Sequence, residues 1–280
     1  LKKKHNIYSF VLDTYVRSDV LQDRFGYDNR AFEQNLRQRG FSIGTRSLSN
    51  YPWTSLSVAS SLSMAYSVKA GPAEPHDSLK ASWKISGFNP VVARLKEAGY
   101  QYVLFHGGRY QSTLSCTGLE DHCLRCEGIL TETDILLLDK TPFAHLLRRF
   151  ATRVFNTFSG ECRLADLNAK LDRLKGKRVF LFAHLMALHD PMNVDSDCNP
   201  LNQPVPEKWL PVGQSRLLDM QIDCLNKEVL TMVDDLVKVD PDAIILLTGD
   251  HGVWPDCKNC EEDSAARLMR HAIFTAMRLP

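Results

Sequence analysis

Short apolar runs alternate with longer amphipathic stretches along this chain. The apolar runs have few polar interruptions, as is typical of strands buried on both faces, and predict strands at residues 7–12, 41–45, 102–105, 179–183, 243–247 and 272–277. Apolar residues at helical spacing predict helices at residues 18–25, 29–39, 90–99, 142–158, 162–175 and 213–238. This alternation predicts a doubly wound α/β fold, with a mostly parallel central sheet and helices on both faces.

A further helix is predicted to begin near Thr54. Pro52 and Trp53 precede a run of small hydroxyl and apolar residues at helical spacing, residues 54–64. A hydroxyl in the first turn of a helix lies among unpaired backbone N–H groups at the positive end of the helix dipole, where a phosphate or sulfate ester can bind. The alternative is that Thr54 or Ser55 only caps the helix.

Two stretches lack such periodicity and are predicted to be loops. Residues 67–87 carry two prolines among polar residues and could form a lid, and residues 107–128 are rich in cysteine. The chain has no internal repeat, no low-complexity segment and no linker, so residues 1–280 are expected to form a single domain. Because the chain begins almost directly on one strand and stops just after another, we interpret it as a fragment of a longer protein.

The composition is that of a globular protein. Hydrophobic residues make up 44% and charged residues 24% of the chain. The net charge of +1, without a basic stripe carrying interleaved aromatic residues, argues against nucleic-acid binding. No apolar stretch approaches the roughly 18–20 residues needed to span a bilayer, and no signal-peptide pattern precedes the first strand.

The chain has eight cysteines, an even number that indicates an oxidising compartment and up to four disulfides. They are Cys116, Cys123, Cys126, Cys162, Cys198, Cys224, Cys257 and Cys260. The pairs Cys123/Cys126 and Cys257/Cys260 have a spacing that could also supply a zinc site. Neither pair lies in a compact zinc-ribbon arrangement, so disulfides are favoured, with a connectivity that the sequence leaves open.

Polar residues follow three of the predicted strands: Asp13, His184 and the adjacent Asp250 and His251. Because ligands gather at the carboxyl ends of the strands in such sheets, we expect these residues to meet near Thr54. Carboxylates with imidazole suit Zn²⁺ or Mn²⁺, and carboxylates alone suit Mg²⁺ or Ca²⁺. A divalent ion beside Thr54 would favour its alkoxide and neutralise a phosphoryl oxygen. Each aspartate, taken alone, could instead be a cap or turn residue.

The chain resembles the sulfatase-like branch of the alkaline phosphatase superfamily. Four segments carry the resemblance and follow the order of that family: Phe10–Asp13, the helix at Thr54, residues 182–191 and Leu247–Gly252. The resemblance covers essentially all 280 residues, and Asp-His-Gly after a strand is its most specific motif. It implies that Asp13, Asp250 and His251 hold a divalent metal, with Thr54 as both nucleophile and fourth ligand.

Other residues are candidate substrate contacts. The resemblance implies that His184 and His189 match histidines that bind a second metal, the ester oxygens or the leaving group in relatives. The family often has proline before the second histidine, where Leu188 stands here, so the path of this loop could differ. Asn50, next to the nucleophile segment, and His106, at the end of a predicted strand, are further candidates, each with a purely structural role as the alternative.

The nucleophile segment determines the subclass. Sulfatases oxidise Cys or Ser within Cys/Ser-x-Pro-x-Arg to formylglycine, whereas residues 54–58 read Thr-Ser-Leu-Ser-Val, and threonine cannot become formylglycine. This segment looks more like that of the phosphoethanolamine and phosphoglycerol transferases, which include lipoteichoic acid synthase-like enzymes. Such enzymes act through a phosphothreonine-type intermediate and commonly have a membrane anchor and an extracytoplasmic catalytic domain.

The resemblance therefore implies a metal-dependent phosphoryl-group transferase or phosphodiesterase. Its substrate would be a lipid or glycan phosphodiester of the cell envelope, and its location periplasmic or on the cell surface, near a membrane. The alternatives are a phosphatase, an atypical sulfatase, or a catalytically silent relative that binds an anionic glycan or lipid headgroup.

Overall fold

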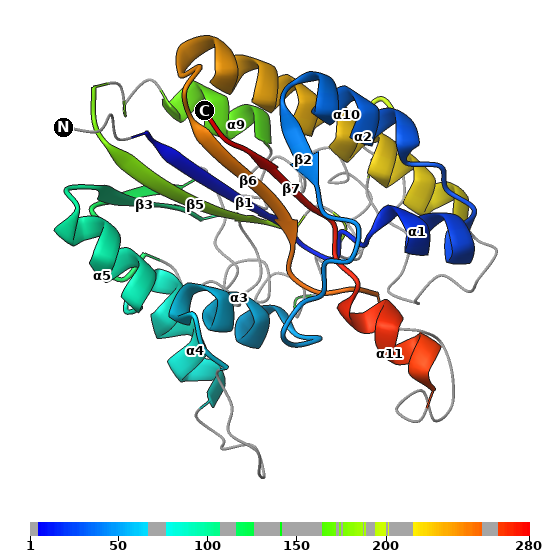
Figure 1. The fold of residues 1–280 in the computed structure, drawn as a ribbon, viewed down its shortest axis with the longest axis horizontal. Coiled ribbons are helices and arrows are strands. Elements are labelled where there is room, and N and C mark those ends of the chain that lie inside the picture. Colours follow the sequence, from blue (N-terminus) through cyan, green and yellow to red (C-terminus); the bar gives the residue numbers. More distant parts are fainter. Residues whose placement is uncertain are drawn as a thin grey trace.

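The computed structural model describes residues 5–66, 77–106, 116–125, 164–171, 176–186, 194–199, 215–253 and 263–280, with residues 141, 174, 188 and 201. Seven strands form one sheet in the order β2-β7-β6-β1-β5-β3-β4 (Figure 1). They are β1 (Ile7–Leu12), β2 (Phe41–Ile43), β3 (Gln101–His106), β4 (His122–Arg125), β5 (Val179–Leu185), β6 (Ile244–Gly249) and β7 (Thr275–Arg278). In this sheet β7 pairs antiparallel with both β2 and β6, and the other neighbouring strands pair in parallel, which confirms the predicted α/β fold with a mostly parallel sheet.

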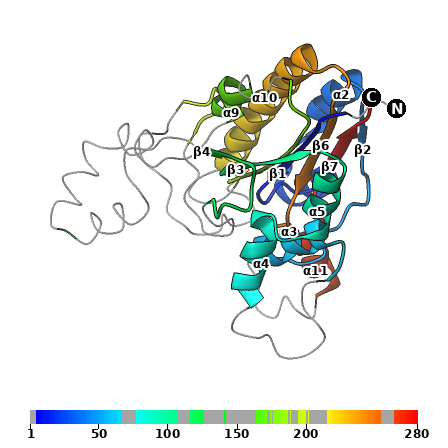
Figure 2. The same cartoon turned by 90° about the vertical axis from the view of Figure 1, so that its left-hand side faces the viewer.

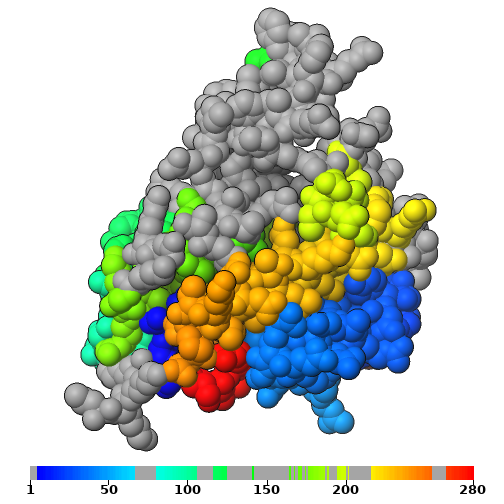
Figure 3. All heavy atoms as spheres, turned by 90° about the horizontal axis from the view of Figure 1, so that it is seen from above, coloured from blue at the N-terminus to red at the C-terminus, as the bar shows by residue number. Residues whose placement is uncertain are grey.

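Helices cover both faces of the sheet. Those described are α1 (Ser18–Val20) with a π-helical turn (Leu21–Phe25), α2 (Arg30–Gln38), α3 (Thr54–Ser63), α4 (Asp77–Ser86), α5 (Pro90–Glu97), α9 (Leu164–Leu171), α10 (Ser215–Val239) and α11 (Ser264–His271). Helices α2, α9 and α10 lie on one face, and α3, α4 and α5 lie on the other (Figures 1 and 2). Seen from above, α10 runs alongside α2 (Figure 3).

Each face of the sheet has its own apolar core. On the α10 side, a stripe of buried side chains steps by three and four residues along the helix: Leu218, Ile222, Leu225, Val229, Met232 and Leu236. On the other side, Val58 of α3, Ile85 of α4 and Val92 of α5 pack with Phe180 and Phe182 of β5. All seven residues of β5 are buried, which explains why its sequence is an apolar run without alternation.

The strand order brings three strand ends together. β1 lies between β5 and β6, and all three run in parallel. In the register, Leu12 pairs with Leu185 of β5 and with Gly249 of β6. Asp13 and Asp250, the residues that follow Leu12 and Gly249, therefore emerge side by side at the carboxyl edge of the sheet.

The prediction that residues 67–87 form a loop is wrong for Asp77–Ser86, which form α4. Ala81 and Ile85 of this helix are buried, but Ser82 and Ser86 share their face and are buried too. The apolar stripe is therefore short and interrupted by hydroxyl residues, and the periodicity gave little indication of a helix.

The structure also corrects two predictions made for other segments. Part of the cysteine-rich segment, His122–Arg125, is strand β4 and pairs in parallel with β3. The last strand begins at Thr275 rather than at residue 272, and the unpredicted helix α11 precedes it. The Asp263 side chain accepts a hydrogen bond from the Ala265 N–H, a cap that marks where α11 begins. The helix predicted at 142–158 lies outside the described residues.

The described residues contain two disulfides, Cys116–Cys123 and Cys198–Cys224. They confirm the preference for disulfides, and they show that Cys123 pairs with Cys116 rather than joining Cys126 in a zinc site. The other four cysteines lie outside the described residues. Within those residues, no helix combines the length and the apolar character that a bilayer crossing requires.

Candidate metal centre and active site

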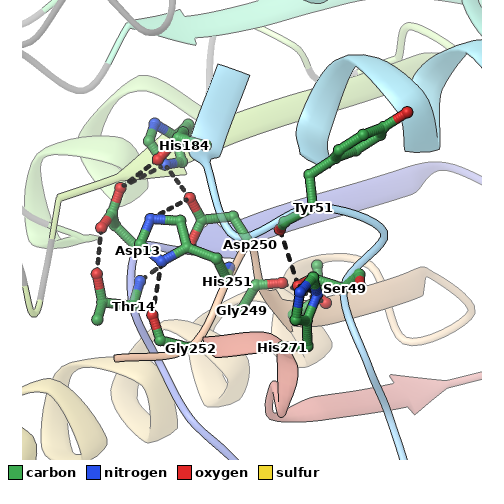
Figure 4. A network of polar contacts seen from close by, with 12 residues as sticks. Asp13, Thr14, Ser49, Tyr51, His184, Gly249, Asp250, His251, Gly252 and His271 are labelled. Carbon is green, nitrogen blue, oxygen red and sulfur yellow. Dashed lines mark hydrogen bonds and ion pairs between the residues drawn. The ribbon is translucent and has the colours of Figure 1, made fainter. Parts of the chain in front are cut away.

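Asp13, His184 and Asp250 converge at the carboxyl edge of the sheet (Figure 4). His184 Nε2 lies 3.2 Å from Asp13 Oδ2 and 3.8 Å from Asp250 Oδ2. One ligand atom from each residue lies within 4.8 Å of the others, and all three side chains are buried. The strand-end pattern predicted that His184 would meet the two aspartates, and its Nε2 atom does lie close to both carboxylates. The substrate contact that the resemblance implied for His184 stays a prediction.

The two carboxylates are held by hydrogen bonds to their Oδ1 atoms. The Thr14 hydroxyl donates to Asp13 Oδ1 at 2.6 Å. The backbone N–H groups of Thr14 and His251 donate to Asp250 Oδ1 at 3.0 Å and 2.8 Å. The two Oδ2 atoms are thereby left facing His184, on the inner side of the cluster.

Burial and charge act in opposite directions on His184 and Asp13. Burial alone would lower the pKa of His184, but the carboxylates of Asp13 and Asp250 raise it to about 9. Burial alone would raise the pKa of Asp13, but its close contact with the charged His184 ring holds it well below the ordinary 3.8. Without a metal ion, the pair is therefore an imidazolium beside a carboxylate at neutral pH.

The residues of this cluster fit a divalent cation. His184 Nε2 and Asp250 Oδ2 are buried and make no hydrogen bond within the described part of the chain. Buried polar atoms normally have partners, so two such atoms facing each other call for an explanation. Carboxylate oxygens with an imidazole nitrogen form a donor set that suits Zn²⁺ or Mn²⁺. A cation bound at His184 Nε2 would have to displace the proton there.

Thr54 is the first residue of α3, and its side chain points to this cluster. The N-cap of the helix is Trp53, which makes no side-chain capping hydrogen bond. Neither Thr54 nor Ser55 is therefore the N-cap that the alternative interpretation required. Instead, Thr54 Oγ1 donates to Asp13 Oδ2 at 3.3 Å. A hydroxyl at a helix N-terminus thus lies directly beside the candidate cation ligands.

His251 lies at the margin of the cluster. Its Nε2 atom is 3.6 Å from Asp250 Oδ2. Its Nδ1 atom is 2.7 Å from the carbonyl oxygen of Gly252, which can only accept a hydrogen bond. Nδ1 therefore carries a proton, and in the neutral ring Nε2 keeps the electron pair that a metal ligand needs.

The remaining predicted site residues are not brought into the cluster. Asn50 is exposed, and its Nδ2 atom donates to Ser60 Oγ at 2.9 Å, so it ties the preceding segment to α3. His106 is the last residue of β3, beside His184 in the register, and only its backbone position is described. His189 lies outside the described residues.

Two glycines that the sequence analysis did not interpret shape the loop after β6. A Cβ at Gly249 would collide with the carbonyl oxygen of Tyr15, and a Cβ at Gly252 would collide with that of Met269. The absence of side chains therefore lets this loop approach the end of β1 on one side and α11 on the other. The only sequence indication was a glycine on each side of Asp250 and His251.

Helix α11 joins the two halves of the site. The Gly252 N–H donates to the Arg270 carbonyl at 2.9 Å, and the Ser49 N–H donates to the His271 carbonyl at 2.8 Å. His271 Nδ1 lies 3.0 Å from the Ser49 carbonyl oxygen, and Ser49 Oγ donates to the Tyr51 carbonyl at 2.9 Å (Figure 4). The segment that leads into α3 and the loop that carries Asp250 thus share one support.

A cavity of about 740 Å³ adjoins the site, between α3, α5 and the sheet. Its lining is mostly apolar and includes Leu62, Val91 and Phe182, with Asn50 and the cluster residue Asp250 among its polar members. A space of this size falls within the range of small-molecule sites.

The stability of the metal-free chain is expected to fall as the pH rises from 6.5 to about 9. The folded-state pKa of His184 lies above its ordinary value of 6.5, so the stability from its charged pairs is complete below 6.5 and is lost as pH rises through about 9. The lowered pKa of Asp13 adds a loss only below pH 3.8. Denaturant unfolding in a chelator at pH 6 and pH 9 measures the difference. His184→Gln should remove most of this pH dependence, and an unchanged dependence in that variant would contradict the assignment.

Several solved structures have folds similar to that of this chain. No protein-family model and no curated protein matches the chain. Among solved structures, one similar to this chain is the C-terminal periplasmic domain of EptC from Escherichia coli, crystallised with Zn. The TM-score is 0.61 and the identity 11%, and the match covers 100% of this chain and 74% of the EptC chain. The lipoteichoic acid synthase LtaP from Listeria monocytogenes is similar with a TM-score of 0.58 and 11% identity. The match covers 99% of this chain and 65% of LtaP.

A third similar structure names the superfamily. It is a protein in the alkaline phosphatase superfamily from Vibrio parahaemolyticus, with a TM-score of 0.56 and 15% identity, over 98% of this chain and 60% of that one. At these identities the similarity establishes the fold. The chain therefore has the alkaline phosphatase superfamily fold, in the form found in the EptC and LtaP domains, as the sequence resemblance implied.

Proposed function

We propose that this protein is a metal-dependent phosphoryl-group transferase or phosphodiesterase. Thr54 would be the nucleophile, and the reaction would pass through a phosphothreonine intermediate. The substrate would be a lipid or glycan phosphodiester of the cell envelope. The two disulfides support a location outside the cytoplasm.

One observation carries this proposal: the Thr54 hydroxyl lies at the N-terminus of α3, 3.3 Å from Asp13 Oδ2, in contact with the Asp13–His184–Asp250 cluster. A nucleophilic hydroxyl needs an activating group within hydrogen-bond reach, and a transferring phosphoryl group needs positive charge around it. Asp13 would be the activating group for the Thr54 hydroxyl, and a cation held by the cluster would supply the positive charge.

In the first step, the Thr54 hydroxyl would lose its proton to water, its Oγ1 atom would attack phosphorus, and the bond from phosphorus to the leaving oxygen would break. The leaving oxygen would take a proton from water and depart as an alcohol. Asp13 Oδ2 accepts the hydrogen bond of the Thr54 hydroxyl and so orients its proton away from the phosphorus. The unpaired N–H groups in the first turn of α3 would stabilise the phosphoryl oxygens. In the second step, an acceptor hydroxyl or water would attack phosphorus and release Thr54.

Asp13, His184 and Asp250 would hold the metal ion, with Thr54 and His251 completing the set. A divalent ion there would supply the positive charge that favours the threonine alkoxide and neutralises the phosphoryl oxygens. His184 is proposed as a ligand because its Nε2 atom lies between the two carboxylates. His189 stays a predicted substrate contact.

The similar structures support the substrate class. They include a lipoteichoic acid synthase and the soluble domain of a lipooligosaccharide phosphoethanolamine transferase from Neisseria meningitidis, with a TM-score of 0.56 and 13% identity. The EptC domain was crystallised with Zn, which supports a divalent metal.

The proposal is tested by loading the purified chain with Zn²⁺ or Mn²⁺ and adding an aryl phosphodiester. We expect release of the aryl alcohol and, after rapid acid quench, a phosphoryl adduct on Thr54 by peptide mass spectrometry. An aryl sulfate should not be cleaved, because threonine cannot form formylglycine. A metal-loaded chain that binds the diester but neither releases alcohol nor forms an adduct would instead be the catalytically silent relative.

A further inference from the structure

Thr14, which follows the first candidate metal ligand, has a left-handed backbone conformation with φ of 59°. A β-branched residue rarely adopts this conformation, because its side chain crowds the neighbouring backbone. Strained residues of this kind persist where the surrounding structure enforces them, and they cluster at functional sites. Thr14 is buried, with 8% of its surface exposed, so its surroundings are protein on nearly all sides.

Backbone hydrogen bonds on both sides of Thr14 enforce this conformation. The Asp13 N–H donates to the Leu185 carbonyl at 2.8 Å, which ties the end of β1 to β5. The Tyr15 N–H donates back to the Leu12 carbonyl at 3.1 Å and closes the turn. The Tyr15 carbonyl accepts from the Phe274 N–H at 2.9 Å, and the Tyr15 side chain is fully buried.

The conformation lets one residue hold two carboxylates. The Thr14 hydroxyl donates to Asp13 Oδ1, and the Thr14 N–H donates to Asp250 Oδ1. Asp250 comes within reach of this N–H because Gly249 has no Cβ to collide with the Tyr15 carbonyl. The left-handed conformation of Thr14 and the missing side chain of Gly249 are thus both needed for the hydrogen bond from the Thr14 N–H to Asp250 Oδ1.

The two hydrogen bonds decide where the remaining oxygens point. Asp13 Oδ2 and Asp250 Oδ2 face His184 Nε2, and all three atoms lie within 4.8 Å of one another. Two buried carboxylates that share a site repel each other, so each would tend to rotate away if its Oδ1 atom were free. Partners of this kind orient metal ligands and change metal affinity when they are removed.

We infer that Thr14 is a positioning residue, whose hydroxyl and N–H hold Asp13 and Asp250 so that their Oδ2 atoms form a preorganised donor set with His184 Nε2. The inference rests on the proposed function, since the cation site is the one proposed above. Thr14 itself is not proposed as a ligand, because its hydroxyl contacts Asp13 Oδ1, the oxygen that does not face His184.

The test measures Zn²⁺ affinity of the whole chain by competition with a chromophoric chelator, a readout that needs no turnover. Thr14→Val removes the hydroxyl and keeps the shape, and the dissociation constant should rise about 10–100-fold. Thr14→Gly also removes the hydroxyl but relieves the strained backbone, so it gives an independent result if the valine variant fails to fold. Thr14→Ser keeps the hydroxyl and should bind like the unmodified chain.

Thr231→Val is the matched control, because the Thr231 hydroxyl donates to the Lys227 carbonyl on α10, away from the cluster. It should leave Zn²⁺ affinity unchanged. Unfolding of each variant in a chelator gives its stability without metal. A role in stability alone would lower the free energy of unfolding and leave the affinity unchanged, and this result would overturn the inference.

Metal binding by the unmodified chain distinguishes a wrong role for Thr14 from a wrong cation site. If the unmodified chain binds Zn²⁺ and the valine and glycine variants bind it equally well, the cation site stands and Thr14 does not position it. If the unmodified chain binds no Zn²⁺, Mn²⁺ or Mg²⁺, the cation site is wrong and the role of Thr14 falls with it.

Discussion

Thr54→Ala is expected to lower kcat for an aryl phosphodiester by about 10³-fold or more, because it removes the only atom proposed to bond to phosphorus. The adduct on the peptide containing residue 54 should also disappear. Zn²⁺ affinity should change much less, since Asp13, His184 and Asp250 remain in place. Steady-state kinetics, acid-quench mass spectrometry and metal titration on the same preparation measure the three quantities.

Two neighbouring substitutions serve as controls for this prediction. Thr54→Ser keeps a hydroxyl at the same position and should retain measurable turnover. Ser55→Ala removes the next hydroxyl on the first turn of α3 and should leave kcat close to that of the unmodified chain. If Thr54→Ala turned over the diester at the normal rate, or if the adduct were found on Ser55, Thr54 would not be the nucleophile.

Asp250→Asn is expected to weaken Zn²⁺ binding by about 100-fold or more and to reduce turnover in parallel. Asparagine can keep its oxygen at the position that accepts from the Thr14 and His251 N–H groups, so the loop should hold its shape. Its amide nitrogen would then replace the unpartnered Oδ2 atom opposite His184, and an amide N–H₂ group cannot bind a cation. The loss should exceed the 10–100-fold seen for partners of metal ligands.

The control for this variant is Asp240→Asn, the same change at a carboxylate that accepts from Asn6 and Tyr8 far from the cluster. It should leave Zn²⁺ affinity unaffected. Comparing the two by isothermal titration, with circular dichroism to confirm folding, separates the ligand role from a general effect of lost charge. Normal Zn²⁺ affinity in Asp250→Asn would remove this residue from the metal site.

The sequence was most informative where one physical requirement dominated. Buried parallel strands need apolar side chains on both faces, so β1, β5 and β6 were visible as apolar runs. Helix α10 must cover the sheet with one face, so its stripe was visible as well. Helix α4 was missed because Ser82 and Ser86 lie on its buried face, and β4 because four residues at the sheet edge carry little pattern.

The candidate site was predicted only in part, for a reason of topology. Residues at strand ends can be identified from sequence, but which strands are neighbours cannot. The sheet order puts β1 between β5 and β6, and this brings His184, Asp13 and Asp250 together at one edge of the sheet. The role of Thr14 was beyond sequence reasoning too, because its left-handed conformation depends on hydrogen bonds that its neighbours make with Leu185 and Phe274, far away in the sequence.

The shared support at the end of α11 has a consequence for the motion of the site. Arg270 holds the loop after β6 and His271 holds the segment before α3, through adjacent carbonyl groups. If the end of α11 shifts, the segment before α3 and the loop that carries Asp250 should be displaced in the same direction. We therefore expect the spacing between the Thr54 hydroxyl and the Asp250 carboxylate to change little when α11 moves, because both segments follow it.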